Sequence, residues 1–410
     1  MSKSFNIGLF GFGCVGQGLY HVLANSKGFR SEITKIVVKN RNKKRTLPEH
    51  FFSFDKNDIL LNPEIDLVVE LIDDANEAFE IVSAALSGGK NVVTANKKMI
   101  AEHFEELIEL QKKYGTALLY EASACGGIPI IRTLEEYYDN ESLKSVRGIF
   151  NGSSNYILTK IFEENLDYSV ALKQAQDLGF AESNPRLDVG GFDAKYKLII
   201  LAAHSYGLVS LPEQVLNFGI ENLSQTDIQV ARKSNFKIKL IAQAAISEKN
   251  NVSLSVLPHF IKHENPLSAI NNEYNAVVVE AAFSDTQLFI GKGAGSHPTG
   301  SAVLSDISAN SYNYQYEYKK KRQQAKYNLD NEKELVVYIR TAFAENRLPL
   351  PFSSIGFQNS EIVVGKIKIA ELILAKKWLE THGAFVAEVG EVLPEIVAYL
   401  NQQELEVVAV

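Results

Sequence analysis

The chain has 410 residues, which is more than one ordinary hydrophobic core accommodates, so we expect two or three domains. Hydrophobic residues make up 46% and charged residues 22% of the chain, which is the balance of a soluble globular protein. The formal net charge of -7 argues against a nucleic-acid partner, because binding phosphates requires a basic face.

The cysteines and the N-terminus bear on the cellular compartment. The two cysteines, Cys14 and Cys125, are too few for a disulfide framework and favour a reducing compartment. We interpret both as small buried hydrophobic side chains, with Cys14 packed at the start of a helix. The N-terminus lacks a signal-peptide pattern, and no segment approaches the roughly 18 to 20 apolar residues of a membrane span. We therefore expect a cytoplasmic protein with no membrane partner.

The first third of the chain alternates short apolar runs with helical patterns. The predicted strands cover residues 7–10, 33–38, 65–72, 91–94 and 116–120. The predicted helices lie at residues 19–23, 78–86 and 100–114. Strands that alternate with helices of this length form parallel βαβ units. The sequence therefore predicts an α/β Rossmann-type nucleotide-binding domain over residues 1–130.

The rest of the chain has a different pattern. Helical patterns cover residues 151–164, 169–178 and 193–206, and strand-like runs cover 252–256, 276–282 and 287–290. This mixture predicts an α+β domain over residues 131–310. The polar segment 311–325 is predicted to be a linker. Residues 326–410, with a strand at 334–341 and a helix at 369–381, are predicted to form a small C-terminal domain.

A glycine-rich loop follows the first predicted strand and opens the first predicted helix. The loop reads Gly-Phe-Gly-Cys-Val-Gly, a G-x-G-x-x-G pattern in the context of a dinucleotide site. Its glycines allow a tight turn, and the helix N-terminus attracts a pyrophosphate. The alternative is a turn that only packs helix against strand. The residues predicted to bind the cofactor here are Gly11, Gly13, Cys14, Val15 and Gly16.

The end of the second predicted strand bears on the choice of cofactor. An acid there would bind the ribose hydroxyls of NAD, but the sequence instead has Lys39 and Arg41. Basic side chains suit the 2′-phosphate of NADP, so the sequence favours NADP over NAD. The alternative is that residues 39–45 form a solvated basic loop.

A second motif combines three carboxylates with a lysine. Asp193 and Lys197 are four residues apart on a predicted helix and share one face, and Glu182 and Asp188 precede them in a loop. Carboxylates can bind the ammonium group of an amino-acid substrate, and a lysine can protonate a carbonyl oxygen as it is reduced. The alternative is a surface loop followed by an ordinary Asp–Lys helix pair.

Several motifs, in this order, resemble those of the homoserine dehydrogenase family. The resemblance spans roughly residues 5–310 and implies reduction of L-aspartate 4-semialdehyde to L-homoserine with NADP or NAD, in threonine, methionine and isoleucine biosynthesis. The motifs are residues 11–18, 92–97, 121–130, 151–158, 182–197 and 291–295, with Pro298, Thr299 and Asp306.

The resemblance also implies roles for individual residues. Lys197 resembles the proton donor to the aldehyde oxygen, and Lys97 the lysine that positions cofactor, substrate and a catalytic water. Asp193 and Asp188 would orient the substrate and the lysine. Glu182 and Ser153 are the implied substrate contacts. The implied cofactor contacts outside the glycine loop are Thr94, Lys97 and Gly295.

The resemblance further implies a monovalent-cation site, a homodimer or homotetramer assembled through the sheet of the middle domain, and an ACT-like regulatory role for the C-terminal domain. The cation, such as sodium, would bind oxygen atoms. The implied ligands are the Glu121 carboxylate and the carbonyls of Ala124, Gly126 and Ile128. The alternative is a buried Glu121 that makes hydrogen bonds only.

The sequence departs from the family pattern at a few positions. Asp73 and Asp74 stand where a glycine pair is usual and would repel a pyrophosphate unless their loop points away. Asn184 stands where an Asp is common, and the C-terminal segment lacks a clear Gly-rich ligand loop. Two alternatives therefore remain: a reductase of another amino-acid-derived carbonyl, and a catalytically inactive ligand-sensing protein on the same scaffold.

Overall fold

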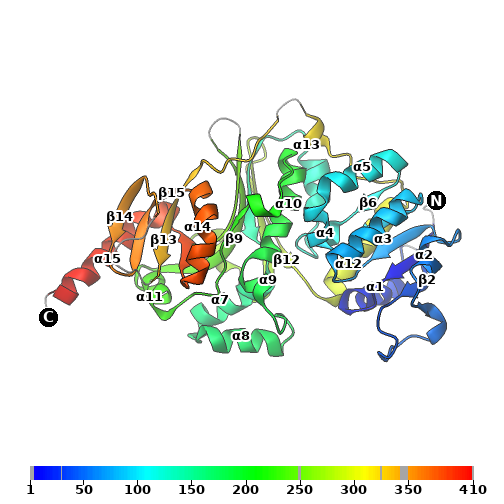
Figure 1. Ribbon diagram of the computed structural model, residues 1–410, viewed down its shortest axis with the longest axis horizontal. Helices are drawn as coiled ribbons and strands as arrows, with labels where there is room; N and C mark the ends of the chain where they lie inside the picture. The colour runs from blue at the N-terminus through cyan, green and yellow to red at the C-terminus, as the bar shows by residue number, and fades with distance from the viewer. Residues whose placement is uncertain (1–3, 29, 248–250, 324–325, 342–349, 409–410) are drawn as a thin grey trace. The chain divides into compact units, whose positions relative to one another are not determined.

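The computed structural model describes residues 4–28, 30–247, 251–323, 326–341 and 350–408 (Figure 1). The chain divides into two compact units, which are described separately. The first contains Met1–Asn140, Ala203–Val209 and Gly291–Gln324, and the second contains Glu141–Ala202, Ser210–Ile290 and Ala325–Val410. This differs from the predicted linear division at residues 130, 310 and 325. The chain returns to the first unit after residue 290, and the C-terminal segment belongs to the second unit.

The first unit is built on a parallel sheet with strand order β3-β2-β1-β4-β5-β6. Its strands are β1 (Asn6–Phe10), β2 (Glu32–Val37), β3 (Phe52–Ser53), β4 (Leu67–Glu70), β5 (Asn91–Thr94) and β6 (Leu118–Leu119). Every residue of β4 is buried, as expected for a central parallel strand covered on both faces. The predicted α/β Rossmann-type fold of this part is confirmed.

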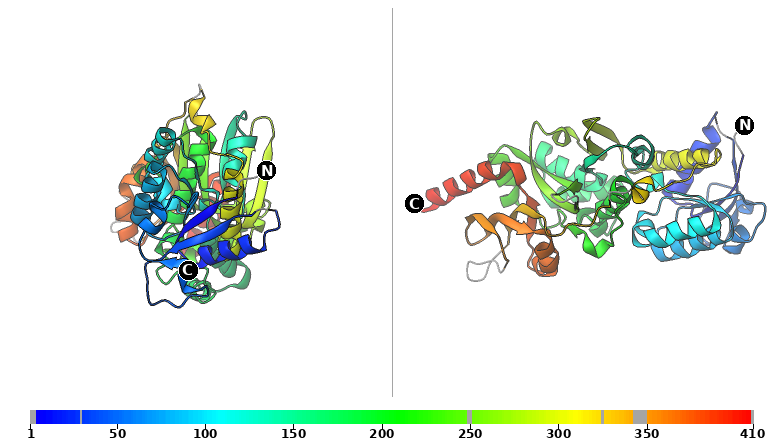
Figure 2. Two further views of the ribbon diagram at one scale, coloured as in Figure 1. Left: turned by 90° about the vertical axis from the view of Figure 1, so that its right-hand side faces the viewer. Right: turned by 90° about the horizontal axis from the view of Figure 1, so that it is seen from above.

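Helices cover both faces of this sheet. They are α1 (Cys14–Asn25), α2 (Asn57–Leu60), α3 (Ala75–Ser87), α4 (Lys97–Glu102), α5 (Phe104–Tyr114), α6 (Ile130–Arg132), α12 (Ser296–Asn310) and α13 (Lys319–Arg322). In the left view of Figure 2, the cyan helices lie on one side of the blue strands, and α1 and the yellow α12 on the other. The α1 and α12 backbones pack so closely that a Cβ atom on Gly18 would lie 2.0 Å from the Ser296 carbonyl oxygen. Only glycine therefore fits at this position.

The predicted linker 311–325 contributes buried side chains to the first unit. Tyr316 and Tyr318 are buried and pack around Tyr120 and His204. His204 Nε2 lies 2.9 Å from the Tyr120 hydroxyl, and Nδ1 lies 2.8 Å from Glu135. The histidine is therefore fully hydrogen-bonded within the core, as expected for a structural rather than a catalytic side chain.

The second unit is built on a mixed sheet that continues into the C-terminal segment. Its strand order is β12-β11-β7-β9-β10-β16-β13-β15-β14, with the short β8 beside β10. The strands are β7 (Leu143–Ile149), β8 (Leu216–Asn217), β9 (Phe236–Ile246), β10 (Val252–Lys262), β11 (Tyr274–Ala281), β12 (Thr286–Lys292), β13 (Glu334–Arg340), β14 (Ser354–Gln358), β15 (Ile362–Lys368) and β16 (Phe385–Glu388). His259 of β10 pairs with Glu388 of β16, so the C-terminal strands extend the central sheet.

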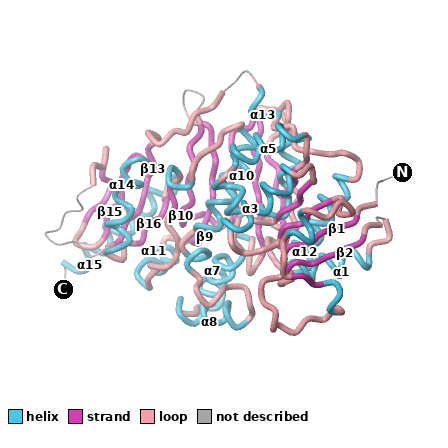
Figure 3. Tube along the Cα trace, turned by 45° about the vertical axis from the view of Figure 1, so that its right-hand side comes forward, coloured by secondary structure: helices cyan, strands magenta, loops and turns pink. Residues whose placement is uncertain are grey.

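The helices of the second unit pack against this sheet and against one another. They are α7 (Gly152–Glu164), α8 (Tyr168–Asp177), α9 (Arg186–Val189), α10 (Phe192–Tyr206), α11 (Gln225–Lys233), α14 (Ile369–Thr381) and α15 (Leu393–Val408). The residues of α10 from Ala203 onward belong to the first unit. Helices α7 and α8 lie side by side (Figure 3). Short α9 lies within the predicted loop 179–191 and leads into α10. Within the described residues, no helix combines the length and the apolar character needed to cross a lipid bilayer.

Candidate active site

The glycine loop between β1 and α1 has the geometry of a pyrophosphate cradle. Gly11 has a φ of +91°, and a Cβ atom there would lie 2.5 Å from the Leu71 carbonyl oxygen. A Cβ atom on Gly16 would lie 2.5 Å from the Gly11 carbonyl oxygen. Gly13 instead faces open space at the N-terminus of α1, where no side chain caps the helix. Unshielded N–H groups at a helix start suit a phosphate, so this loop fits a dinucleotide.

The prediction that Cys14 is buried is wrong. Cys14 is the first residue of α1 and is exposed, since the helix start faces outward rather than into the core. Its carbonyl oxygen accepts a hydrogen bond of 2.9 Å from the Ser296 hydroxyl. Cys125, by contrast, is buried as predicted. Gly295, the remaining glycine of the predicted cofactor set, has a φ of +121° immediately before α12.

The basic loop after β2 is exposed and partly ordered by aromatic contacts. The Arg41 guanidinium lies 4.5 Å from the Phe54 ring centre. Lys39 lies 3.6 Å from Glu77 of α3, so an acid does approach this loop, although it comes from another element. The loop thus presents cations without an acid at the end of β2 itself.

The two acids after β4 are arranged so that Asp74 has a structural role. Asp74 is the N-cap of α3, and its Oδ1 atom accepts hydrogen bonds of 2.9 Å from the N–H groups of Asn76 and Glu77. The bond from Glu77, followed by the bond from Asn76, holds the pKa of Asp74 below its usual value. Because its carboxylate caps α3, Asp74 is turned toward the α3 backbone. The predicted repulsion between Asp74 and a cofactor pyrophosphate is therefore not expected.

Thr94 and Lys97 lie at the turn between β5 and α4. Thr94 is buried and its hydroxyl donates to Glu70 over 2.5 Å. Lys97 is the first residue of α4, and Asn96 caps this helix by accepting a 3.0 Å hydrogen bond from Met99. The carboxyl ends of β4 and β5 are therefore tied together where a doubly wound sheet binds its ligand.

A buried lysine–carboxylate pair lies in the second unit. Lys197 Nζ donates to Asp193 Oδ2 and to the Phe150 carbonyl oxygen, each over 2.7 Å. Both side chains are buried, and their spacing along α10 places them on one face, as predicted. The Lys197 ammonium group is therefore fixed in direction by two acceptors.

Asn151, just before α7, was not among the predicted site residues. Its amide nitrogen donates to Asp188 Oδ1 over 2.7 Å and to Asp193 Oδ2 over 2.9 Å. Its amide oxygen caps α7 by accepting a 2.7 Å hydrogen bond from Ser154. Asn is a favoured N-cap residue, but the bridge from Asn151 to two distant acids cannot be seen in the sequence.

The remaining predicted substrate residues differ in their surroundings. Ser153 is buried, and its hydroxyl donates to the Phe180 carbonyl oxygen. Glu182 is exposed in the loop before α9, where its carbonyl oxygen accepts a 3.0 Å hydrogen bond from Gln176. Asp193, Asp188 and Lys197 thus form one hydrogen-bonded group, whereas Glu182 stands on the exposed part of the same loop.

Glu121 of the predicted cation site accepts several hydrogen bonds. Its Oε1 atom accepts from Ile131 N and its Oε2 atom from Arg132 N, each over 2.8 Å, and Arg132 Nε lies 3.4 Å from Oε2. Asp306 Oδ2 accepts from Glu121 N over 2.8 Å. Burial raises the pKa of both Glu121 and Asp306.

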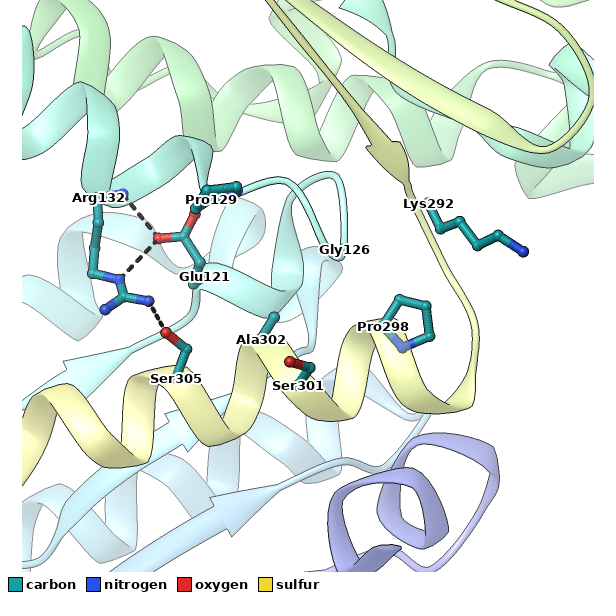
Figure 4. Close-up of a pocket in the computed structure, with 10 residues that line it drawn as sticks. Glu121, Gly126, Pro129, Arg132, Lys292, Pro298, Ser301, Ala302 and Ser305 are labelled. Atoms are coloured by element: carbon teal, nitrogen blue, oxygen red, sulfur yellow. Dashed lines mark hydrogen bonds and ion pairs between the residues drawn. The ribbon is translucent and has the colours of Figure 1, made fainter. Parts of the chain in front are cut away.

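A cavity of about 400 Å³ lies beside this group. Glu121, Gly126, Arg132 and Ser305 are among the residues that line it (Figure 4). Among the described residues, His, Cys, Asp and Glu do not gather in threes or more around a possible metal position. Glu121 Oε1 has one N–H donor and keeps a lone pair, so the donor set still fits a weakly held monovalent cation that also binds carbonyl oxygens.

The parallel sheet and its glycine cradle are typical of a dinucleotide-binding domain, and the buried lysine pair of the second unit is a candidate acid for carbonyl reduction. Comparison with known families agrees. The NAD-binding domain profile of homoserine dehydrogenase matches residues 11–121, and the homoserine dehydrogenase profile matches residues 129–308. The chain belongs to the homoserine dehydrogenase family. The predicted family and its NAD(P)-dependent activity are confirmed.

Individual relatives support this assignment. The homoserine dehydrogenase of Bacillus subtilis is 37% identical over 316 residues, covering 75% of this chain and 73% of the relative. That of Helicobacter pylori is 38% identical over 314 residues, covering 75% and 74%. The crystal structure of a homoserine dehydrogenase from Thiobacillus denitrificans is 27% identical, with a TM-score of 0.80 over 94% of this chain and 98% of that one. A hyperthermophilic archaeal homoserine dehydrogenase in complex with NADPH is 27% identical, with a TM-score of 0.64 over 77% and 99%.

Proposed function

We propose that this protein reduces L-aspartate 4-semialdehyde to L-homoserine with NADPH as the preferred reductant and Lys197 as the proton donor. The observation that carries the proposal is the buried Lys197–Asp193 pair, tied to Asp188 by Asn151. A dinucleotide domain alone would not specify a reaction, because many activities share that fold.

Lys197 can act as an oriented acid. A lysine ammonium group has three N–H donors. Asp193 and the Phe150 carbonyl take two of them within the described residues, which leaves one for a substrate oxygen. The nicotinamide supplies the hydride to the aldehyde carbon, and negative charge then grows on the aldehyde oxygen. Lys197 stabilises that charge and transfers its proton.

The carboxylates around Lys197 suit the zwitterionic substrate. Asp188 is half-buried and Glu182 exposed, so both can reach a substrate ammonium group, and Ser153 orders the neighbouring loop. Asp193 acts on Lys197 rather than on the substrate. Lys97, at the start of α4, would serve the cofactor side together with Thr94 and Gly295.

NADP preference rests on the loop after β2. Lys39 and Arg41 offer two cations, and Arg41 is already oriented over Phe54. A 2′-phosphate would attract both, whereas the 2′-hydroxyl of NAD would attract neither strongly. Glu77 beside Lys39 can accept a ribose hydroxyl, so we expect NAD to bind with lower affinity rather than be excluded.

We also propose a monovalent cation held by Glu121 Oε1 and the carbonyl oxygens of Ala124, Gly126 and Ile128. Cys125 and Gly126 both have positive φ, which turns this loop sharply beside Glu121. The test compares thermal stability in sodium chloride and choline chloride for the wild type and Glu121→Gln. A sodium-specific rise in Tm that Glu121→Gln removes supports the site, and identical curves in both salts refute it.

A homodimer or homotetramer in the cytoplasm and an ACT-like role of the C-terminal segment also stay proposals. Leu288 and Ile290 of the edge strand β12 and Phe283 in the turn before it are exposed, which favours assembly through this sheet. Light scattering after size exclusion tests the mass. Inhibition by threonine, lost when the C-terminal segment is perturbed, tests the regulatory role.

The function itself is tested by adding homoserine to the protein with NADP or NAD and following reduced nicotinamide by its absorbance. We expect turnover with homoserine, at lower KM for NADP than for NAD, and little turnover with other hydroxy amino acids. Turnover of a different hydroxy acid in preference to homoserine would favour the alternative of another reductase.

A further inference from the structure

A buried carboxyl group ends the central strand of the first unit. Glu70 is the last residue of β4 and is fully buried. Its Oε1 atom accepts a 2.6 Å hydrogen bond from Ile72 N, and its Oε2 atom accepts one of 2.5 Å from the Thr94 hydroxyl. A buried carboxylate is costly unless donors satisfy it, so these two contacts explain how Glu70 is accommodated.

The contacts of Glu70 belong to a closed network. Thr94 Oγ1 accepts a 3.0 Å hydrogen bond from Asn96 N, so the Thr94 hydrogen points to Glu70. The side-chain Nδ2 atom of Asn96 donates to the Ile72 carbonyl oxygen over 3.2 Å. The network thereby joins the loop after β4 to the turn after β5. That turn begins α4 and carries Lys97.

The position of this network within the sheet links it to the cofactor. Glu70 pairs with Phe10 of β1, and Leu71 N donates to the Phe10 carbonyl oxygen over 2.8 Å. The Leu71 carbonyl oxygen lies where a Cβ atom on Gly11 would clash. The strand order reverses at β1 and β4, and a doubly wound sheet binds its ligand at that point. Glu70 therefore lies beneath both the glycine loop and the Lys97 turn.

We propose that Glu70 is a positioning residue of the nicotinamide site, whose carboxylate fixes the Thr94–Lys97 turn against the loop after β4. The inference rests on the proposed cofactor site and adds a residue that does not touch the cofactor. The polarity of the network requires an acceptor at position 70. A Gln side chain has the same shape, but it would have to turn its NH₂ group toward Thr94 or Ile72, where a donor already points.

The network is also sensitive to protonation. Burial raises the pKa of Glu70 to about 7, against the hydrogen bonds from Thr94 and Ile72, and Asp73 raises it further. Phe10 and Thr94, which β1 and β5 present to Glu70, carry no charge. The other charged groups of these loops are Lys97 at the start of α4 and Asp74, whose pKa Lys39 and Lys98 help to lower. Protonated Glu70 carries an O–H donor on one of the two oxygens that now face donors, which weakens that contact, so the turn should loosen as the pH falls through about 7.

The stability of the folded protein should also depend on the protonation of Glu70, and with the opposite pH trend from cofactor binding. Because the folded pKa is raised from 4.5, the folded state binds this proton more tightly than the unfolded state. The contribution of Glu70 to stability is therefore present below pH 4.5 and is lost as the pH rises through about 7. Cofactor binding should follow the opposite trend, since the ordered turn needs the ionised form.

The experiment measures the Kd of NADPH by calorimetry, and the Tm of the cofactor-free protein, from about pH 6 to pH 8.5. The variants are Glu70→Gln, Thr94→Val, Thr94→Ser and a control, Glu80→Gln, which removes one carboxylate from the exposed face of α3. We expect NADPH binding to strengthen with pH in the wild type and the control. We expect Glu70→Gln to bind about tenfold more weakly and with a smaller rise with pH than the wild type, since the 2′-phosphate of NADPH itself titrates at about pH 6 in every variant.

Because Thr94 is itself a proposed cofactor contact, the readout for its variants is the pH profile of NADPH binding and not the affinity alone. Thr94→Val should move this profile to higher pH, because Glu70 loses the hydrogen bond that lowers its pKa, and Thr94→Ser should keep the wild-type profile because the serine hydroxyl can donate to Glu70. If Glu70→Gln does not fold, the contrast between Thr94→Val and Thr94→Ser decides. Wild-type affinity and pH profile in Glu70→Gln, or a wild-type pH profile in Thr94→Val, would overturn the inference. A wild type that does not bind NADPH or NADH would instead overturn the proposed cofactor site.

Discussion

The role of Asn151 can be tested by removing its side chain. In Asn151→Ala, Asp188 and Asp193 each lose one donor, and α7 loses its cap. The cap contributes about 1 kcal/mol to stability. A hydrogen bond to a charged group contributes about 1.5 to 3 kcal/mol. The lost hydrogen bond to Asp193 should let this carboxylate, and with it Lys197, move from its position. If this raises the activation free energy by about 2 kcal/mol, kcat should fall roughly 30-fold.

Asn155→Ala is a matched control for this variant. Asn155 is also a buried Asn of the α7 region, and its amide donates to the carbonyl oxygens of Ile270, Asn272 and Tyr274. These contacts hold a loop and do not involve Lys197. We expect both variants to unfold at lower urea concentration, but only Asn151→Ala to lose kcat while keeping the Kd of NADPH. Equal kcat in the two variants, measured below their unfolding transitions, would refute the positioning role of Asn151.

Three further predictions concern packing, the C-terminal segment and cofactor choice. Gly18→Ala should sharply reduce Tm or soluble yield, because its Cβ atom would lie 2.0 Å from the Ser296 oxygen, whereas Gly28→Ala, which meets no atom within 4 Å, should leave Tm nearly unchanged. Arg340→Met should cost about 3 to 5 kcal/mol in urea denaturation, because it leaves the buried Asp227 without the ion pair that joins β13 to α11; a loss below about 1 kcal/mol would contradict this. Replacing both Lys39 and Arg41 by Ala should raise the KM for NADP about tenfold or more with little effect on NAD, and an unchanged KM for NADP would favour the solvated-loop interpretation.

The sequence predicted the first unit well because its elements depend on local signals. Buried parallel strands such as Leu67–Glu70 read as continuous apolar runs, and Asn91–Thr94 lies where it was predicted. The Asp193–Lys197 pair was also predictable, since helical spacing alone places the two side chains together.

The elements that sequence reasoning missed depend on long-range contacts. The start of α12, Ser-His-Pro-Thr-Gly-Ser, has the composition of a loop and becomes helical where it packs on Gly18. Lys237 and Lys239 interrupt the apolar pattern of β9, yet Lys239 is buried because Asn155 and the Ile270 carbonyl oxygen accept its hydrogen bonds. The return of the chain to the first unit after residue 290 is likewise not marked by composition.

The most direct test of the account compares Lys197→Met with Lys195→Met, which removes a second buried lysine from the same helix. Homoserine-dependent reduction of NADP and the Kd of NADPH are measured for both folded variants and the wild type. The account predicts that Lys197→Met binds NADPH normally but loses at least about a hundredfold in kcat, whereas Lys195→Met retains most of its activity. Near-wild-type turnover by Lys197→Met would contradict the assignment of Lys197 as the proton donor.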